Sequence, residues 1–135
     1  TVSIGSGHSL DVDGRIIVSG SVSSPVIMNS ISGNHEGLVF NYSSDGLGSR
    51  VENLSVVDSK YGVTIYGSDP VISNLTVNNA DNVAVDLYGG RLTLNRGSCY
   101  IGRRSGRTRI FDNMEIWHRP IDWRILHTDC QRGPD

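Results

Sequence analysis

A short phrase that returns at a nearly fixed interval constrains the fold more than any other feature of this sequence. The phrase 53-NLSV-56 returns as 74-NLTV-77, and asparagine also stands at Asn29, Asn95 and Asn113. Successive asparagines of this series are about 20 residues apart, an interval within the range of known repeat proteins. Self-similarity at such a period predicts a solenoid, in which each repeat forms one coil that packs on the next.

A second phrase follows the first within a repeat and alternates apolar with polar residues, as in 83-VAVDL-87 and 121-IDWRI-125. Such alternation predicts short β-strands, and the 16 glycines among 135 residues supply many turns. Val63 and Val83 occupy equivalent positions of successive repeats. Such recurrence of like residues is expected where coils stack in parallel and in register, but not in a β-sandwich. We therefore predict an all-β parallel solenoid of about six coils, forming a single domain over residues 1–135.

Asparagine at the repeated positions suits the sharp corners between strands. It tolerates the left-handed backbone that a corner needs, and its side-chain amide can bond to the Asn of the next coil. Asn41, Asn53 and Asn74 also lie in Asn-x-Ser/Thr, a weak signal for glycosylation. We interpret Asn53 and Asn74 as corner residues. A longer echo, between residues 25–41 and 70–86, which open with PVIMNS and PVISNL, is interpreted as two passes of the same coil, two turns apart.

Several of these phrases resemble one known family. They include 37-GLVF-40, 62-GVTI-65 and 68-SDPVISN-74, together with the opening segment over residues 5–30. The pattern resembles the right-handed parallel β-helix proteins of the pectate-lyase-like type, over about residues 1–97. The resemblance implies a right-handed parallel β-helix in a secreted or cell-surface protein. The family includes lyases, hydrolases, adhesins and tailspikes, so the resemblance does not choose a function.

The two ends of the chain are expected to differ from the regular coils of residues 1–95. Residues 96–109 are rich in arginine, whereas residues 110–126 align with 71–87 if one residue is dropped. We expect 96–135 to form either a degenerate coil or a cap, because the end of a solenoid exposes its core and its strand edges. No cap is visible at the N-terminus, which opens at Thr1 in strand-like sequence and is interpreted as the start of a fragment or processed product. The open end is expected to pair with an upstream coil or with a second copy of the chain, as a homo-oligomer.

Charge is unevenly distributed along the chain. Residues 1–90 carry nine acidic and three basic side chains, whereas residues 91–135 carry five acidic and nine basic ones. Arg103, Arg104 and Arg107 are weak candidates for binding an anion such as phosphate or a sulfated sugar, with a solvated loop as the alternative. Few aromatic residues interleave with them, so nucleic acid is not expected as a partner. No apolar run is long enough to span a membrane.

The two cysteines, Cys99 and Cys130, are well separated in the sequence. They would pair if the tail folds back on the last coil, and the alternative is two ordinary small side chains.

Acidic residues are the weak candidates for chemistry. The resemblance implies that a lyase would use acidic residues to bind calcium and a basic residue to take a proton, whereas a hydrolase would use clustered Asp residues. Asp58, Lys60 and Asp81 fall along one turn and are catalytic candidates, with a surface ion pair as the alternative. Asp11 and Asp13 share one strand face and are candidates for a loose calcium site, with hydrogen-bond acceptors of a turn as the alternative. No other cofactor is expected.

Two functions remain open at this stage. The preferred one is a non-catalytic module of a secreted or cell-surface protein, with a structural, adhesive or glycan-binding role. Tyr61, Tyr66 and Tyr88 are its candidate binding residues, and Tyr42 is a further one, because all four are expected at or near turns where a ring can contact a polysaccharide. The alternative is that these tyrosines are ordinary side chains at the edge of the core. The alternative is a polysaccharide lyase or glycoside hydrolase, or a fragment of one, that acts on an acidic polysaccharide. Short turns leave little room for a catalytic cleft, which favours the first function.

Overall fold

A computed structural model describes the backbone of residues 1–95, 97–100, 108–111 and 114–117, and the side chains of residues 1–81 and 84–95. Nearly all of this part of the chain is strand, as predicted. The strands are β1 (Val2–Ile4), β2 (Ser9–Val12), β3 (Ile17–Ser19), β4 (Val26–Ser30), β5 (Gly37–Phe40), β6 (Arg50–Ser68), β7 (Val71–Leu94), β8 (Gly97–Tyr100), β9 (Thr108–Phe111) and β10 (Met114–Trp117), and one 3₁₀ turn, η1, covers Tyr42–Ser44.

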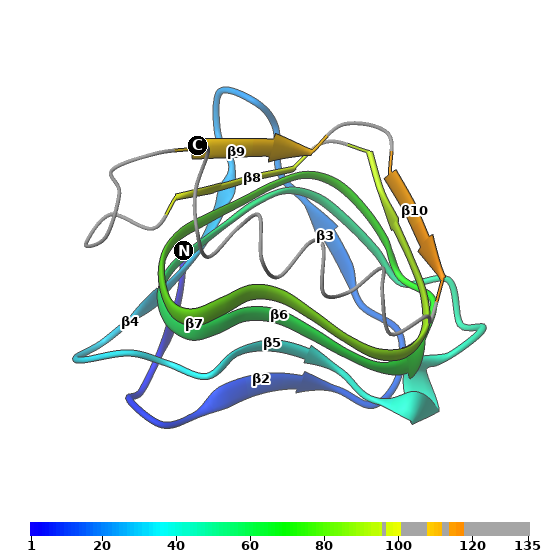
Figure 1. Ribbon diagram of the computed structural model, residues 1–135. Coiled ribbons are helices and arrows are strands. Elements are labelled where there is room, and N and C mark those ends of the chain that lie inside the picture. Colours follow the sequence, from blue (N-terminus) through cyan, green and yellow to red (C-terminus); the bar gives the residue numbers. More distant parts are fainter. Residues whose placement is uncertain (96, 101–107, 112–113, 118–135) are drawn as a thin grey trace.

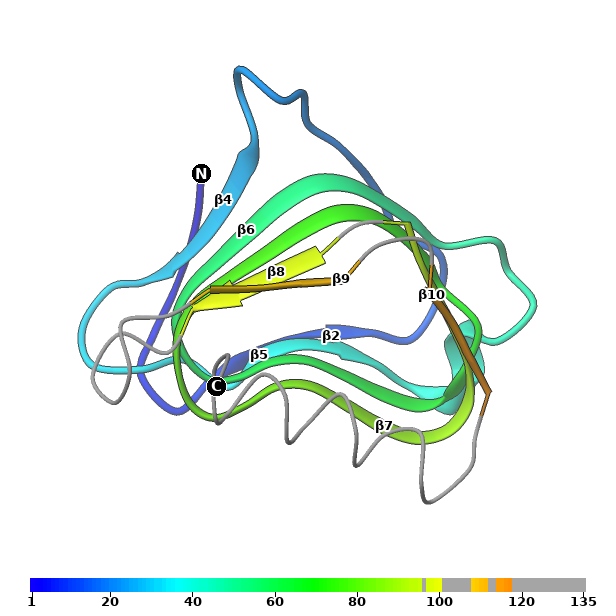
Figure 2. The same ribbon diagram turned by 45° about the horizontal axis from the view of Figure 1, so that its top comes forward.

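Parallel strands stack in register around three sides of a solenoid (Figure 1). The first face consists of β1, β4, residues 54–57 of β6, residues 75–78 of β7, and β8. The second face consists of β2, β5, residues 63–66 and residues 85–88. The third face consists of β3, residues 50–52 and residues 71–73. The long strands β6 and β7 run beside each other around almost the whole coil (Figure 2), so the chain is a parallel β-solenoid.

The solenoid has about four turns rather than the six expected. The early coils are longer than the repeated phrase suggests, since Ile17 pairs with Arg50 and Leu38 pairs with Val63. The shorter repeat, as between Leu54 and Leu75, applies only to the later turns. Loops in the early coils lengthen the repeat without changing the fold, and the one between β3 and β4 projects from the solenoid (Figure 2).

Identical apolar side chains stack inside the solenoid because every second residue of each strand points inward. Leu54 pairs with Leu75, as the repeat predicts. Val63, in contrast, pairs with Val85 and not with Val83, because the register shifts between Ser59 and Tyr61. The buried core includes Met28, Leu38, Phe40, Val51, Val56, Ile65, Ile72, Val77, Leu87, Leu92 and Leu94.

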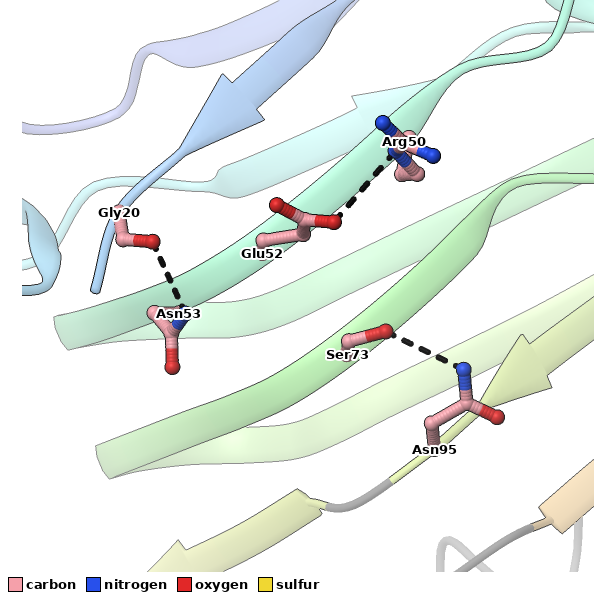
Figure 3. A network of polar contacts seen from close by, with 6 residues as sticks. All are labelled: Gly20, Arg50, Glu52, Asn53, Ser73 and Asn95. Atoms are coloured by element: carbon pink, nitrogen blue, oxygen red, sulfur yellow. Dashed lines mark hydrogen bonds and ion pairs between the residues drawn. The ribbon is translucent and has the colours of Figure 1, made fainter. Parts of the chain in front are cut away.

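Corner residues form polar ladders between coils, as predicted. Asn53 and Asn74 adopt φ values of 54° and 60°, and the Asn74 side-chain amide donates a hydrogen bond of 2.5 Å to Asn53 Oδ1. Asn53 in turn donates to the carbonyl of Gly20 at 2.9 Å (Figure 3). At the next corner, Asn79 (φ 61°) donates to Asp58 Oδ1 at 2.7 Å, and Asp58 has a φ of 55°. These ladders satisfy amide groups that would otherwise interrupt the stack.

Two of the repeated asparagines lie outside these ladders, which corrects the prediction from spacing. Asn29 pairs with Ser3 on the first face and accepts its hydroxyl hydrogen bond. Asn95 donates a hydrogen bond of 3.2 Å to Oγ of Ser73, which precedes the corner residue Asn74 (Figure 3). The longer echo is also wrong as two passes of one coil, because Val26 lies on the first face opposite Leu54, whereas the equivalent residue of the second phrase lies on the third face.

Beyond residue 95 the described strands first continue the parallel stack and then pair antiparallel. β8 still stacks in parallel on β7, with Gly97 opposite Leu75. β9 then pairs antiparallel with β8, and β10 pairs antiparallel with residues 91–94 of β7. A further coil would have paired in parallel, as β9 and β10 do not. Whether residues 96–135 form a degenerate coil or a cap stays a prediction. Cys130, Arg103, Arg104 and Arg107 lie outside the described residues, so the pairing of Cys99 and the anion-binding candidates stay predictions.

The N-terminal end of the solenoid leaves apolar side chains open. Val2 and Ile17 are 41% and 46% exposed. Beside them, a small apolar pocket of about 90 Å³ reaches into the first turn and is lined by Val2, Leu10, Ile16, Val18, Val26, Met28, Leu38 and Leu54. Within the described part of the chain, no helix has the length and apolar character needed to cross a membrane.

We predict that two substitutions of Asn74 separate the contribution of its hydrogen bond from that of its left-handed backbone conformation. Asn74→Ala loses the bond to Asn53 and keeps a Cβ at a left-handed φ of 60°. The free energy of unfolding should therefore fall by about 2 kcal/mol. Asn74→Gly loses the bond without that backbone strain and should cost about 1 kcal/mol. Urea denaturation measures both. Equal losses in the two variants, or a comparable loss in the exposed Asn95→Ala control, would contradict this assignment.

Candidate functional site

Two tyrosines stack on the outside of the second face. Tyr66 of β6 and Tyr88 of β7 are register partners, so parallel stacking places one ring on the other. Their centroids are 5.2 Å apart and their planes differ by 13°, which is an offset stack. The two residues are 45% and 49% exposed. Large parts of both rings therefore remain open to a ligand.

A buried carboxylate holds the second ring in place. The Tyr88 hydroxyl donates a hydrogen bond of 2.8 Å to Asp86 Oδ2, on the same side of the strand. This bond, followed by burial of the hydroxyl, raises the pKa of Tyr88 to about 12. Asp86 is only 4% exposed, and its Oδ1 is buried without a hydrogen-bond partner in the described part of the chain. The Tyr88 hydroxyl is thus fixed by a buried carboxylate of its own strand.

We predict that Asp86→Asn lowers the pKa of Tyr88 toward its ordinary value of 10.0. The amide keeps the shape of the side chain but replaces the charged acceptor of the Tyr88 hydrogen bond, and that bond to the carboxylate is the largest cause that disfavours the tyrosinate. NMR-monitored titration of ring-labelled tyrosine measures the change, and Tyr88→Phe identifies the resonance. An unchanged Tyr88 pKa in Asp86→Asn would show that Asp86 does not hold the phenol.

Glycines form the corner that follows the tyrosines. Gly67 and Gly89 have φ values of 63° and 78°, a conformation that side chains rarely adopt. A Cβ on Gly67 would lie 2.8 Å from Cδ2 of Tyr42, so the Tyr42 ring rests directly on this backbone. Tyr42 is 75% exposed. We call Tyr42, Tyr66 and Tyr88 the tyrosine face.

A pocket of about 350 Å³ adjoins the tyrosine face at the same corner, and we call it the corner pocket. Asp69 is anchored there, since its Oδ1 accepts the Gly46 N–H at 2.9 Å. Gly67 directly follows Tyr66, so the pocket and the ring stack share one stretch of backbone. The pocket is lined by Asp45, Gly67, Asp69, Gly90 and Arg91. Its volume lies at the lower end of the range typical of small-molecule sites.

The structure brings together two of the three predicted binding tyrosines and places the third apart. Tyr61 is half-buried, and the ammonium of Lys60 lies 5.7 Å from its ring centroid, a cation–π contact. The role of the three tyrosines in binding stays a prediction.

The catalytic candidates each have a separate structural partner. Asp58 accepts the corner bond from Asn79. Asp81 accepts a hydrogen bond from Asn34, and Lys60 lies over Tyr61. Among the described residues, no group of three His, Cys, Asp or Glu side chains gathers to hold a metal ion. The structure therefore offers no support for a shared catalytic site of these three residues, whose role remains untested.

The calcium candidates act as hydrogen-bond acceptors at a turn. Asp11 Oδ1 accepts from the Ser9 hydroxyl at 2.6 Å. Asp13 Oδ1 accepts from the Asn41 amide at 2.8 Å and from the Ser43 hydroxyl at 3.3 Å. These bonds fit the turn alternative, and calcium binding by Asp11 and Asp13 stays a prediction.

A fully buried histidine has no counterpart in the sequence analysis. His35 is 0% exposed. Its Nδ1 accepts the Gly37 N–H at 3.0 Å, so Nε2 carries the hydrogen that is donated to the Val57 carbonyl at 3.0 Å. Burial lowers the pKa of His35 below its ordinary value of 6.5. The neutral ring is thus the form that the fold accommodates.

We predict an acid-sensitive fold because of His35. Its pKa is lower in the folded than in the unfolded chain, so the unfolded chain binds more protons below about pH 6.5. The stabilisation is complete above that pH and is lost as the pH falls toward the lowered pKa. Urea denaturation between pH 7.5 and about 5 measures this. The free energy of unfolding of His35→Gln should fall less with decreasing pH than that of the wild type or of the exposed control His8→Gln. Equal falls in all three proteins would contradict the role of His35.

The corner pocket was also missed by the sequence analysis. Gly67 and Gly89 stand one repeat apart, which was a usable signal for a glycine corner. Asp45, in contrast, comes from the loop after η1 and belongs to no repeat.

Comparison of the chain with family models, with curated proteins and with solved structures returns no match. The resemblance to pectate-lyase-like proteins therefore concerns the repeat pattern alone.

Proposed function

We propose that this chain is a non-catalytic β-solenoid module of a secreted or cell-surface protein, and that it binds a polysaccharide on the tyrosine face. The observation that carries the proposal is the exposed offset stack of Tyr66 and Tyr88, with centroids 5.2 Å apart. Sugar rings present flat C–H surfaces that pack on aromatic rings, while their hydroxyls bond to polar groups at the rim. The tyrosine face and the corner pocket supply both kinds of contact.

Rigidity supports binding through these rings. Tyr88 is held by Asp86, and the backbone beneath both rings belongs to the regular stack of β6 on β7. A ring that is already fixed loses little conformational entropy when a ligand covers it. The surface therefore resembles a preorganised binding site more than an incidental patch of exposed side chains.

The catalytic alternative has less support. Glycoside hydrolysis needs two carboxyl groups facing each other across the scissile bond. Asp58 and Asp81 each accept a hydrogen bond from an asparagine amide. None of the three catalytic candidates, Asp58, Lys60 and Asp81, lines the corner pocket, whose carboxyl groups are those of Asp45 and Asp69.

A glycan array probed with the labelled chain tests the proposal. We expect signals on polysaccharides, and we expect them to persist in EDTA because the tyrosine face requires no metal. An array without any bound glycan would overturn the proposal. Release of shorter or unsaturated products from a bound polysaccharide would instead establish the enzyme alternative.

The open N-terminal end suggests a second property. We propose that its apolar surface pairs with another solenoid end, in the simplest case that of a second copy. The half-exposed Val2 and Ile17 and the small apolar pocket beside them support this, since such patches favour association. Light scattering should give a mass above the 14.7 kDa of one chain, and Ile17→Asp should restore the mass of a single chain. A clean monomer for the wild type would contradict the proposal.

A further inference from the structure

We infer that the corner pocket is a subsite for an uncharged sugar unit whose hydroxyl groups donate to Asp45 and Asp69, and that these carboxylates select against polymers of uronic acids. The inference rests on the proposed function, because it names the ligand class of the same surface. The tyrosine face and the corner pocket adjoin each other, because Gly67 directly follows Tyr66 and also lines the pocket. A chain that stacks on the tyrosine face therefore extends directly into the corner pocket.

The shape of the pocket depends on glycine. A Cβ on Gly90 would lie 2.2 Å from the Ser68 carbonyl oxygen, which is backbone and cannot move aside. A Cβ on Gly67 would meet the Tyr42 ring. Both positions must therefore lack a side chain, Gly90 because of the neighbouring coil and Gly67 because of the Tyr42 ring, so that neither residue adds a side chain to the lining of the pocket.

The chemistry of the pocket suits hydroxyl donors. Asp69 is oriented by the Gly46 N–H on one oxygen, and its other oxygen has no hydrogen-bond partner in the described part of the chain. Asp45 lies on the exposed loop after η1. A carboxylate only accepts hydrogen bonds, and a pair of carboxylates suits a ligand that offers several O–H groups.

A buried carboxylate orients the tyrosine that adjoins the pocket. Asp86 is 4% exposed and accepts the Tyr88 hydroxyl on Oδ2, while its Oδ1 has no partner among the described residues. Because Oδ1 is closed off from solvent, Asp86 acts on a ligand by fixing the Tyr88 hydroxyl and not by direct contact.

The charges on this side explain the expected selectivity. Asp45 and Asp69 outnumber Arg91 in the pocket, and the exposed Asp11 adds negative charge on the second face. A uronic-acid unit would place its carboxylate against this surface, and like charges disfavour association. A neutral unit meets the same acceptors without repulsion.

Calorimetric titration of the folded chain tests the inference. The probes are cellohexaose, xylohexaose, mannohexaose and hexagalacturonate. We expect at least one neutral hexasaccharide to bind at least tenfold more tightly than hexagalacturonate, with little dependence on salt. Asp45→Ala/Asp69→Ala should weaken neutral binding about tenfold, as expected for lost bonds to charged acceptors. Asp45→Asn/Asp69→Asn should strengthen hexagalacturonate binding, whereas Glu36→Gln/Glu52→Gln, which removes as much charge elsewhere, should not.

The possible outcomes distinguish failure of the corner-pocket subsite from failure of polysaccharide binding on the tyrosine face. Unchanged neutral binding in Asp45→Ala/Asp69→Ala, with binding lost in Tyr66→Ala, would overturn the subsite and leave the tyrosine face as the binding surface. Tighter binding of hexagalacturonate than of every neutral probe would also overturn the inference, and would assign the pocket to Arg91. Absence of binding to every probe and every arrayed glycan would remove the proposed function itself. A thermal melt of each variant confirms that it is folded.

Discussion

Replacing Gly37 with alanine is expected to destabilise the solenoid by about 4 kcal/mol or more, which is a large part of the stability of a typical domain. Gly37 has a φ of 96°, and a Cβ built on it would lie 1.9 Å from the Tyr61 carbonyl oxygen and 2.7 Å from that of Gly62. Both obstacles are backbone of the next coil. The coils would have to separate at this point, which breaks the parallel pairing of β5 with β6.

A matched glycine isolates the cause of this effect. Gly7 also has a positive φ, of 76°, but a Cβ there meets no atom within 4 Å. Gly7→Ala should therefore cost only the strain of the backbone conformation, about 1–2 kcal/mol. Urea denaturation followed by circular dichroism gives both values. Similar losses in the two variants would mean that close stacking of coils is not what requires glycine at position 37.

Removing both rings of the stack is expected to have the largest effect on binding. Tyr66→Ala/Tyr88→Ala should weaken polysaccharide binding about thirtyfold or more, since central aromatic residues typically contribute about 2 kcal/mol or more to an interface. Both side chains lie outside the buried core and are about half exposed, so the double variant should remain folded. Calorimetric titration with the polysaccharide that gives the strongest array signal measures the loss.

The conservative variant controls for the ring itself. Tyr66→Phe/Tyr88→Phe keeps the offset stack and loses both hydroxyls, including the bond to Asp86. Its affinity should stay within a few-fold of wild type if stacking dominates. A folded alanine double variant that binds as tightly as wild type would rule out the tyrosine face as the binding surface.

The recurring phrase was sufficient to predict how the coils stack, but not how many there are. Leu54 over Leu75 and the corner bond from Asn74 to Asn53 follow from the period of that phrase. Loop lengths follow no period, so the wide separation of Ile17 and Arg50 was not predictable. The bulge between Ser59 and Tyr61 likewise changes the register by an amount that spacing does not reveal.

The candidate site was predictable only where it follows the repeat. Tyr66 and Tyr88 stand one repeat apart and were expected near turns, although their stacking on each other was not. The corner pocket combines Asp45 from a loop with Asp69 from the end of a coil. No spacing rule relates a loop residue to a coil residue, so only the folded chain shows that they meet.

The central claim is that the tyrosine face binds a polysaccharide, and NMR of ring-labelled tyrosine tests it most directly. The neutral hexasaccharides are added to the folded chain, and Tyr66→Phe and Tyr88→Phe assign the two resonances. We predict that the ring signals of Tyr66 and Tyr88 shift with increasing ligand, and that the shift saturates. Binding that leaves both signals unmoved, or no binding by any of the hexasaccharides, would contradict the account.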